Sequence, residues 1–312
     1  MKKFEVRTDL AVEAREKYAG TDVEIDGVVL EKEYDRFTGI NTTKVVITNK
    51  NGEKAMGKPP GTYITLESQA LQMPDENYHR EISNKISEHI LRLIPGLINE
   101  KEKMFILVVG LGNVNVTPDA LGPKVVDNLH INRHLENSKD KKVVSSIVPG
   151  VMAQTGIETA EVVRAVVDET CPDIIIAVDS LAARSTYRVN TTIQITDTGI
   201  NPGSGVGNNR CGLSMETMGV PVIAIGVPTV VDAATIVNDT MEHLIDGLSS
   251  SEKLSEFTSA LGSFSRQEKY QLIKEILEPH IGTMYVTPKD VDETIEMISY
   301  TISEGINMAM EH

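Results

Sequence analysis

Several features are scarce in this 312-residue chain, and each scarcity excludes a class of protein. Only two cysteines occur, Cys171 and Cys211, which are too few for a disulfide framework, so we expect a reducing, cytoplasmic compartment. No apolar run approaches the ~20 residues that cross a bilayer, so we expect no membrane partner. The N-terminal residues lack the apolar segment of a secretory signal.

Positive charge is also in short supply. Thirty Lys and Arg against 45 Asp and Glu give a formal net charge of −15. Phosphate-bearing partners require clustered Lys and Arg, so we expect no direct binding of nucleic acid. Hydrophobic residues make up 40% of the chain, which is enough for a core in one large α/β domain or two smaller ones.

From Met104 onward, short apolar runs alternate with amphipathic stretches. We predict strands near 105–110, 143–148, 173–179 and 221–227, a further strand from Thr191, and helices near 122–131, 156–170 and 233–247. This alternation predicts βαβ units with a parallel sheet. The last helix, expected from Asp290 to Met310, carries isoleucines at core-facing spacing, at positions 295, 298, 302 and 306.

The N-terminal third has a different pattern. Runs of strand-forming residues at 23–32, 43–48 and 62–66 are separated by Gly and Asn turns, and they predict an antiparallel β excursion over about 20–70. A helix with apolar residues from Ile82 to Leu97 follows, limited or kinked by Pro95. Residues 249–266 are interpreted as an insertion, followed by a helix near 267–278.

Two aspartates follow two of the predicted buried strands. Asp119 comes after the run that begins at Met104, and Asp179 ends the run that begins at Asp173. The carboxyl ends of parallel strands share one edge of the sheet, where ligands bind, whereas Asp173 lies at the opposite edge. Taken alone, Asp119 would be interpreted as a helix N-cap, and Asp179 as bonded to the N–H groups that follow it.

A converging carboxylate pair can perform acid/base hydrolysis. Proximity splits the two proton affinities, so one ionised member activates water while the protonated member polarises a carbonyl. Other catalytic signatures are missing from the sequence: no histidines have metalloprotease spacing, and no Gly-x-Ser-x-Gly elbow is present.

Two loops carry further candidate residues. The segment from Gly110 to Asn113 lacks the third glycine of a dinucleotide fingerprint, so its glycines are interpreted as shaping a turn that aims Asn113 and Asp119. A second group combines glycines at 203–207 with three arginines, Arg184, Arg188 and Arg210. Such a group could hold an extended acidic peptide, or it could be an ordinary surface loop.

Five longer motifs together resemble the germination protease family of spore-forming bacteria. They are Val-Arg-Thr-Asp-Leu-Ala-Val-Glu-Ala at 6–14, Gly-Leu-Gly-Asn at 110–113 with Val-Thr-Pro-Asp-Ala-Leu-Gly-Pro at 116–123, and the segments 148–156, 179–185 and 199–210. The resemblance extends from the N-terminus to about Asp239. It implies an atypical aspartic endopeptidase that degrades small acid-soluble spore proteins at germination, in the spore core.

The resemblance implies further properties. The family's two essential aspartates map onto Asp119 and Asp179. The expected fold is a phosphorylase/hydrolase-like α/β sheet with flanking helices, similar to that of the hydrogenase-maturation proteases. Members are homotetrameric zymogens, and no cofactor or metal is expected. A rival hypothesis is a metal-dependent peptidase or amidase with the same aspartates as ligands, and a second rival is a non-catalytic protein.

The family cleaves after an acidic residue that is followed by a large hydrophobic residue and Ala. Asp9-Leu10-Ala11 is the only triplet of this form in the chain. We therefore expect a prosegment over residues 1–9, self-cleavage between Asp9 and Leu10, and a single protease domain over 10–312. An arginine of the second group would neutralise the acidic residue of the substrate.

Overall fold

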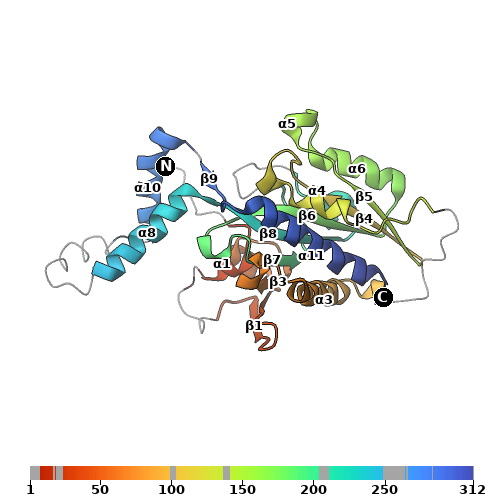
Figure 1. Ribbon diagram of the computed structural model, residues 1–312, viewed down its shortest axis with the longest axis horizontal. Coiled ribbons are helices and arrows are strands. Elements are labelled where there is room, and N and C mark those ends of the chain that lie inside the picture. The colour runs from red at the N-terminus through yellow and green to blue at the C-terminus, as the bar shows by residue number, and fades with distance from the viewer. Residues whose placement is uncertain are drawn as a thin grey trace.

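One mixed sheet forms the centre of the molecule. The computed structural model describes residues 8–16, 18, 24–98, 103–135, 141–203, 211–248, 264, 266–282 and 284–311. The strand order is β1-β2-β3-β7-β8-β6-β4-β5, with β9 paired to β8 (Figure 1). The strands are β1 (Val28–Tyr34), β2 (Asn41–Ile47), β3 (Gly61–Glu67), β4 (Met104–Gly110), β5 (Lys142–Ile147), β6 (Ile174–Ala183), β7 (Thr192–Thr196), β8 (Val222–Asp232) and β9 (Tyr285–Val286).

The predicted parallel sheet is confirmed in the half that contains both aspartate-bearing segments. Strands β5, β4, β6 and β8 are neighbours in that order and all three pairings are parallel. The apolar side chains of β4, β6 and β8 are buried on both faces, which is why these runs are continuous rather than alternating. The carboxyl ends of β4 and β6 therefore lie next to each other.

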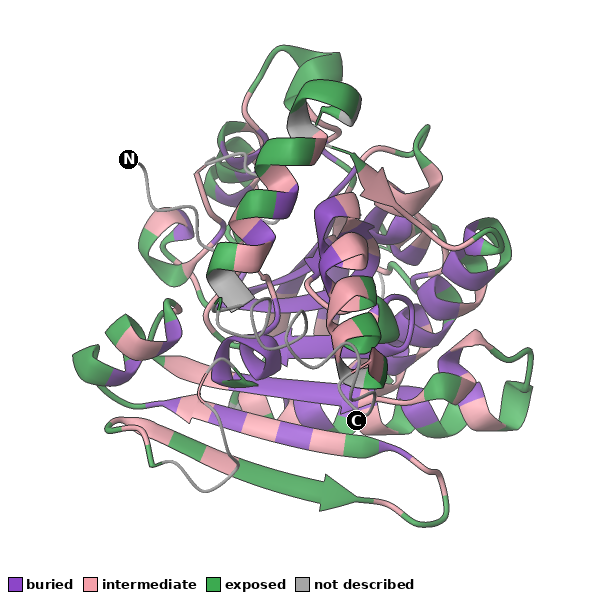
Figure 2. Cartoon of the chain, turned by 90° about the vertical axis from the view of Figure 1, so that its left-hand side faces the viewer, coloured by how far each residue is buried: buried purple, intermediate pink, exposed green. Residues whose placement is uncertain are grey.

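The predicted antiparallel excursion is also confirmed, and it extends the same sheet. Strands β1, β2 and β3 form antiparallel pairs, and β3 pairs with β7, which pairs with β8. Burial decreases from the central strands to the edge strand β1, which is mostly exposed (Figure 2). The strand predicted from Val23 begins at Val28, and residues 19–23 lie outside the described part of the chain.

Helices cover both faces of the sheet. The α-helices are α1 (Ala11–Glu16), α2 (Lys50–Met56), α3 (Glu76–Leu93), α4 (Leu121–Asp127), α5 (Met152–Thr155), α6 (Thr159–Thr170), α7 (Met215–Met218), α8 (Ala233–Leu248), α10 (Arg266–Ile281) and α11 (Val291–Glu311). The four isoleucines of the last helix are fully buried in the main core, as predicted. Helix α3 packs beside α11 on that face and ends just before Pro95, as expected.

The opposite face carries α6, whose Val163 and Val167 pack in a second core cluster. Helix α1 packs on the same side of the antiparallel half, because Ala11 and Ala14 share a cluster with residues of β2 and β3. Helices α8 and α10 pack against each other and project from one end of the molecule in Figure 1. The insertion predicted over 249–266 lies almost entirely outside the described residues.

His89 of α3 gives the fold a predicted sensitivity to acid. The side chain is buried, and neither ring nitrogen has a hydrogen-bond partner among the described residues. Burial, together with the positive charges of Arg92, Lys85 and Lys44, lowers the pKa of His89 to about 4. This pKa lies below the ordinary value of about 6.5. The contribution of His89 to the free energy of unfolding is therefore fully present above pH ~6.5 and is lost as the pH falls to ~4.

We expect protonation of His89 to remove roughly 3 kcal/mol from the free energy of unfolding between pH 7 and pH 4. Urea denaturation of the wild type and of His89→Phe at several pH values measures this contribution. The variant should lose less stability than the wild type on acidification. Equal losses in the two proteins would show that His89 does not titrate in this interval.

Candidate active site

The loop that follows β4 is closed by Asp119. The backbone N–H of Asn113 donates to the Asp119 carboxylate Oδ2 at 2.8 Å and to the Asp119 carbonyl at 3.0 Å. Gly112 has φ +118°, and a Cβ at this position would lie 1.9 Å from the Asp119 carbonyl oxygen. Glycine is therefore required for this turn, which is the role that the sequence predicted for the glycines here.

Asp119 is not a helix N-cap. It ends a 3-10 turn, η3 (Thr117–Asp119), and Ala120 is the residue that caps α4, without a side-chain hydrogen bond. The capping interpretation of Asp119 is therefore wrong. The Thr229 hydroxyl of β8 donates to the Pro118 carbonyl at 2.6 Å, and so ties η3 to the sheet beside β6.

Asp179 is buried within β6 at the same edge. Its Oδ1 accepts the Ser180 N–H at 2.9 Å, one of the bonds expected for a residue with a structural role alone. The Leu111 N–H donates to the Val178 carbonyl at 2.8 Å, which brings the end of β4 beside Asp179. Asp173 lies at the opposite end of β6, where its carboxylate accepts the Phe105 N–H, as expected.

The segment before α1 lies against this part of the sheet. The Leu10 side chain is fully buried and packs with Val12 and with Leu181 of β6. The Asp9 carboxylate Oδ2 accepts the Ala182 N–H at 3.1 Å. The Asp9 carbonyl oxygen accepts from Lys58 Nζ at 2.8 Å and from Gln194 Nε2 at 3.1 Å.

The sheet register relates this segment to Asp179. Asp179 of β6 is paired with Gly226 of β8, which is paired with Gln194 of β7. Residues paired directly across strands point to the same face, so Asp179 and Gln194 share a face with a glycine between them. A Cβ on Gly226 would lie 2.5 Å from Leu181 Cδ1, so the glycine leaves room for the Leu181 side chain that contacts Leu10. The Asp9–Leu10 bond is thus held over the face that carries Asp179.

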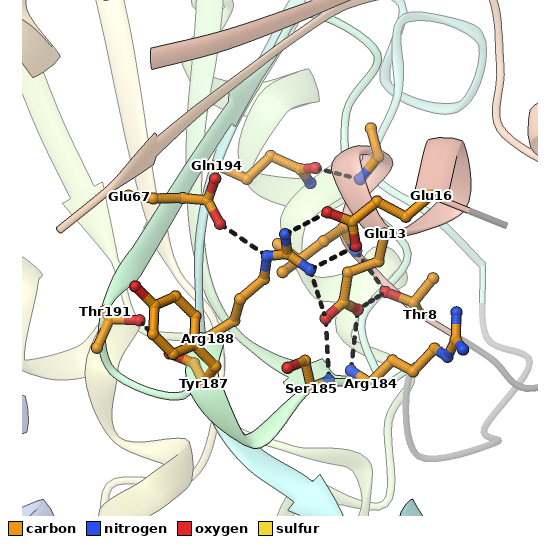
Figure 3. A network of polar contacts seen from close by, with 12 residues as sticks. Thr8, Glu13, Glu16, Glu67, Arg184, Ser185, Tyr187, Arg188, Thr191 and Gln194 are labelled. Carbon is orange, nitrogen blue, oxygen red and sulfur yellow. Dashed lines mark hydrogen bonds and ion pairs between the residues drawn. The ribbon is translucent and has the colours of Figure 1, made fainter. Parts of the chain in front are cut away.

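A network of charges fixes α1 in place (Figure 3). The Glu13 carboxylate is 1% exposed and accepts the backbone N–H groups of Arg184 at 2.9 Å and Ser185 at 3.0 Å. Arg188 reaches Glu13, Glu16 and Glu67, with its shortest contacts 2.6 Å to Glu16 and 2.7 Å to Glu67. Burial opposes its ionisation, but the hydrogen bond to Glu16 and the charge of Glu67 outweigh burial and raise the pKa of Arg188.

The other residues predicted to bind substrate do not gather in one described site. Asn113 Oδ1 accepts from Gln154 Nε2 at 2.7 Å and from the Asn115 N–H, so its side chain is turned toward α5. The Arg184 guanidinium points away from Glu13 in Figure 3. Arg210 and most of the glycine segment 203–207 lie outside the described residues.

Sequence reasoning missed two residues that contact the Asp9 carbonyl, Lys58 and Gln194. Gln194 carried a signal, because it is a polar residue between Ile193 and Ile195 in a strand that is buried throughout. Lys58 carried none, since a lysine after Gly57 in a turn is ordinarily a solvated residue.

Gly112→Ala tests the tightness of the Asp119 loop. We expect the variant to lose more stability than Gly39→Ala, because Gly39 also has positive φ but a Cβ added there would meet no atom within 4 Å. Holding a residue with a Cβ at such a positive φ costs about 1–3 kcal/mol, and the contact with Asp119 adds to this cost. Thermal unfolding of both variants measures the difference, and equal losses would contradict the close approach.

Metal-ligating side chains do not gather in the part of the chain that the structure describes. It contains no group of three or more His, Cys, Asp and Glu side chains placed to hold a metal ion. Among the same residues, no helix is long and apolar enough to cross a membrane.

Comparison with known proteins gives the family. The profile of the germination protease family matches residues 5–259 and 246–312. The germination protease of Clostridium tetani is 50% identical over 98% of this chain and 95% of its own length, and that of Caldanaerobacter subterraneus is 48% identical over 98% and 94%. The Bacillus cytotoxicus germination protease is 42% identical over 100% of this chain and 95% of its own length. The chain therefore belongs to the germination protease family.

Proposed function

We propose that this chain is an endopeptidase precursor that cleaves its own Asp9–Leu10 bond with Asp119 and Asp179. Its family makes it a protease with a role in spore germination. The proposal of self-cleavage rests on one observation, the position of the Asp9–Leu10 bond over the sheet face that carries Asp179. The Asp9 carbonyl is bound by Gln194, which shares a sheet face and a register row with Asp179.

The contacts of the segment match the cleavage preference expected from the resemblance. The acidic residue before the bond is recognised by the Ala182 N–H, and the large hydrophobic residue after it packs against Leu181. Ala11 is fully buried against the antiparallel strands, so a larger side chain at this position would be overpacked. The order acidic, large hydrophobic, Ala thus has a physical reason at each position.

The two aspartates supply the acid and the base. One carboxylate, ionised, takes a proton from the attacking water, and the other carries a proton that it can give. Two interacting carboxyl groups titrate as a pair and share one proton over a range of acidic pH. Cleavage therefore requires both side chains.

The substrates in trans are proposed to be small acid-soluble spore proteins, cleaved in the cytoplasm of the spore by a homotetramer. An acidic residue of such a substrate would bind the Ala182 N–H, and Arg184 or Arg210 would be the candidate to neutralise its charge. Arg188 is a weaker candidate for that role, because three glutamates already surround it. The likeness of the sheet to that of the hydrogenase-maturation proteases stays a prediction.

N-terminal sequencing over time tests this proposal. The purified chain is held at mildly acidic pH with and without a chelator. We expect a new N-terminus at Leu10 that forms equally in both samples. Absence of cleavage at this bond would contradict the proposal, and cleavage that stops with chelator and resumes with a divalent ion would support the metal-dependent alternative.

A further inference from the structure

We propose that Lys58 and Gln194 are catalytic residues that bind the oxyanion formed from the carbonyl of the cleaved bond. This inference rests on the proposed function, because it takes Asp9–Leu10 as the bond that is cut. The two side chains donate to the same oxygen, the Asp9 carbonyl, at 2.8 and 3.1 Å. Donors converging on a carbonyl oxygen are the arrangement that stabilises the negative charge of a tetrahedral intermediate.

Gln194 is held in the orientation that this role requires. Its Oε1 accepts the Ala11 N–H at 2.7 Å while its Nε2 donates to the Asp9 carbonyl. The amide therefore spans Leu10, with one contact to the carbonyl of the cleaved bond and one to the N–H that follows Leu10. The side chain is buried in the centre of the sheet, where a hydrogen bond to a developing charge is stronger than in water.

Lys58 approaches the same oxygen from the loop between α2 and β3. Gly57 ends α2 with φ 64°, which turns the chain, and the Pro59 carbonyl accepts the Tyr63 hydroxyl at 2.8 Å. The loop is therefore anchored on both sides of Lys58. Its ammonium group also contacts the Thr8 carbonyl at 3.4 Å, so it lies along the backbone of the segment that is cut.

The chemical step balances with these groups. Water attacks the Asp9 carbonyl carbon, its proton passes to the ionised aspartate, and the π electron pair moves to the carbonyl oxygen. Lys58 and Gln194 hold that oxyanion. The pair then re-forms the C=O bond as the C–N bond breaks, and the Leu10 nitrogen takes a proton from an aspartate. The products are a new α-carboxylic acid on Asp9 and a free α-amino group on Leu10. The acid then gives its proton to the amine, and the aspartate pair again holds the single proton with which it began.

This assignment changes the role of the protonated aspartate. From the sequence, that carboxyl group is expected to polarise the carbonyl. With Lys58 and Gln194 on the oxygen, the proton is available for the departing amine instead. The charge of Lys58 also balances the negative charge that develops on the oxygen during the attack.

The rate of self-cleavage tests the assignment. Lys58→Met and Gln194→Glu each remove one donor, and the second substitution keeps an acceptor for the Ala11 N–H. Each should slow cleavage at Asp9–Leu10 by about 10²–10³-fold. Lys58→Arg, which restores a charged donor, should recover part of the rate. Lys54→Met, at an exposed lysine of α2, is the matched control and should cleave at the wild-type rate.

A second measurement separates catalysis from anchoring. Hydrogen exchange of the amides of residues 10–14 reports whether the segment stays docked in each variant. Slow cleavage with unchanged protection supports the assignment. An unchanged cleavage rate overturns it. So does a cleavage rate that falls in proportion to the loss of hydrogen-exchange protection, because undocking of the segment would then explain the slower cleavage. Wild-type protein is followed in parallel, and absence of cleavage there would refute the proposed function itself.

Discussion

Replacing either Asp119 or Asp179 by Asn is expected to slow cleavage of the Asp9–Leu10 bond by about 10²–10⁴-fold, the contribution of one general acid or base. Asn keeps the size of the side chain and an oxygen that can accept the Asn113 or Ser180 N–H. The fold should therefore be retained while the proton transfer is lost. Mass spectrometry of the intact chain over time measures the rate.

Asp173→Asn is the matched control for this experiment. Asp173 directly precedes β6, at the edge of the sheet opposite to Asp179, and its carboxylate accepts the backbone N–H of Phe105. We expect cleavage at the wild-type rate. If Asp119→Asn or Asp179→Asn also cleaved at that rate, the carboxylate would have a structural role alone.

Arg188→Ala is expected to lower the free energy of unfolding by about 3–5 kcal/mol, the cost of breaking a buried ion pair from one side. The Arg188 side chain is only 11% exposed, and its guanidinium contacts the carboxylates of Glu13, Glu16 and Glu67. Its removal leaves Glu13 buried with backbone N–H groups but without this countercharge. Urea denaturation at neutral pH measures the loss.

Arg92→Ala provides the comparison for an exposed pair. Arg92 Nη2 lies 3.8 Å from Glu88 Oε2, and the two side chains are 67% and 50% exposed. Such a pair contributes at most about 1 kcal/mol. If Arg188→Ala cost no more than Arg92→Ala, the network around α1 would not stabilise the docked N-terminal segment.

Most of the fold could be predicted because its signals are local. The runs of β4 and β6 are apolar on both faces, and the isoleucines of α11 recur at helical spacing. The joining of the antiparallel strands to the parallel ones depends on the pairing of β3 with β7, which are far apart in sequence. No periodicity within either strand specifies that long-range pairing.

The candidate site shows the same division. From the ends of the predicted strands, Asp119 and Asp179 were expected at the same edge of the sheet. The structure brings the two segments that carry them together. The capping interpretation of Asp119 was wrong because the turn at 117–119 delays the helix by one residue. Lys58 and Gln194 could not be placed, because their contact with Asp9 depends on how the N-terminal segment docks on the sheet.

The concentration dependence of self-cleavage tests the central claim most directly. In this structure the Asp9–Leu10 bond is held on the sheet of its own chain, with Leu10 fully buried. We therefore predict a first-order reaction whose rate constant is the same at every protein concentration. A rate constant that rises in proportion to concentration would contradict this prediction, because one molecule would then be cutting another.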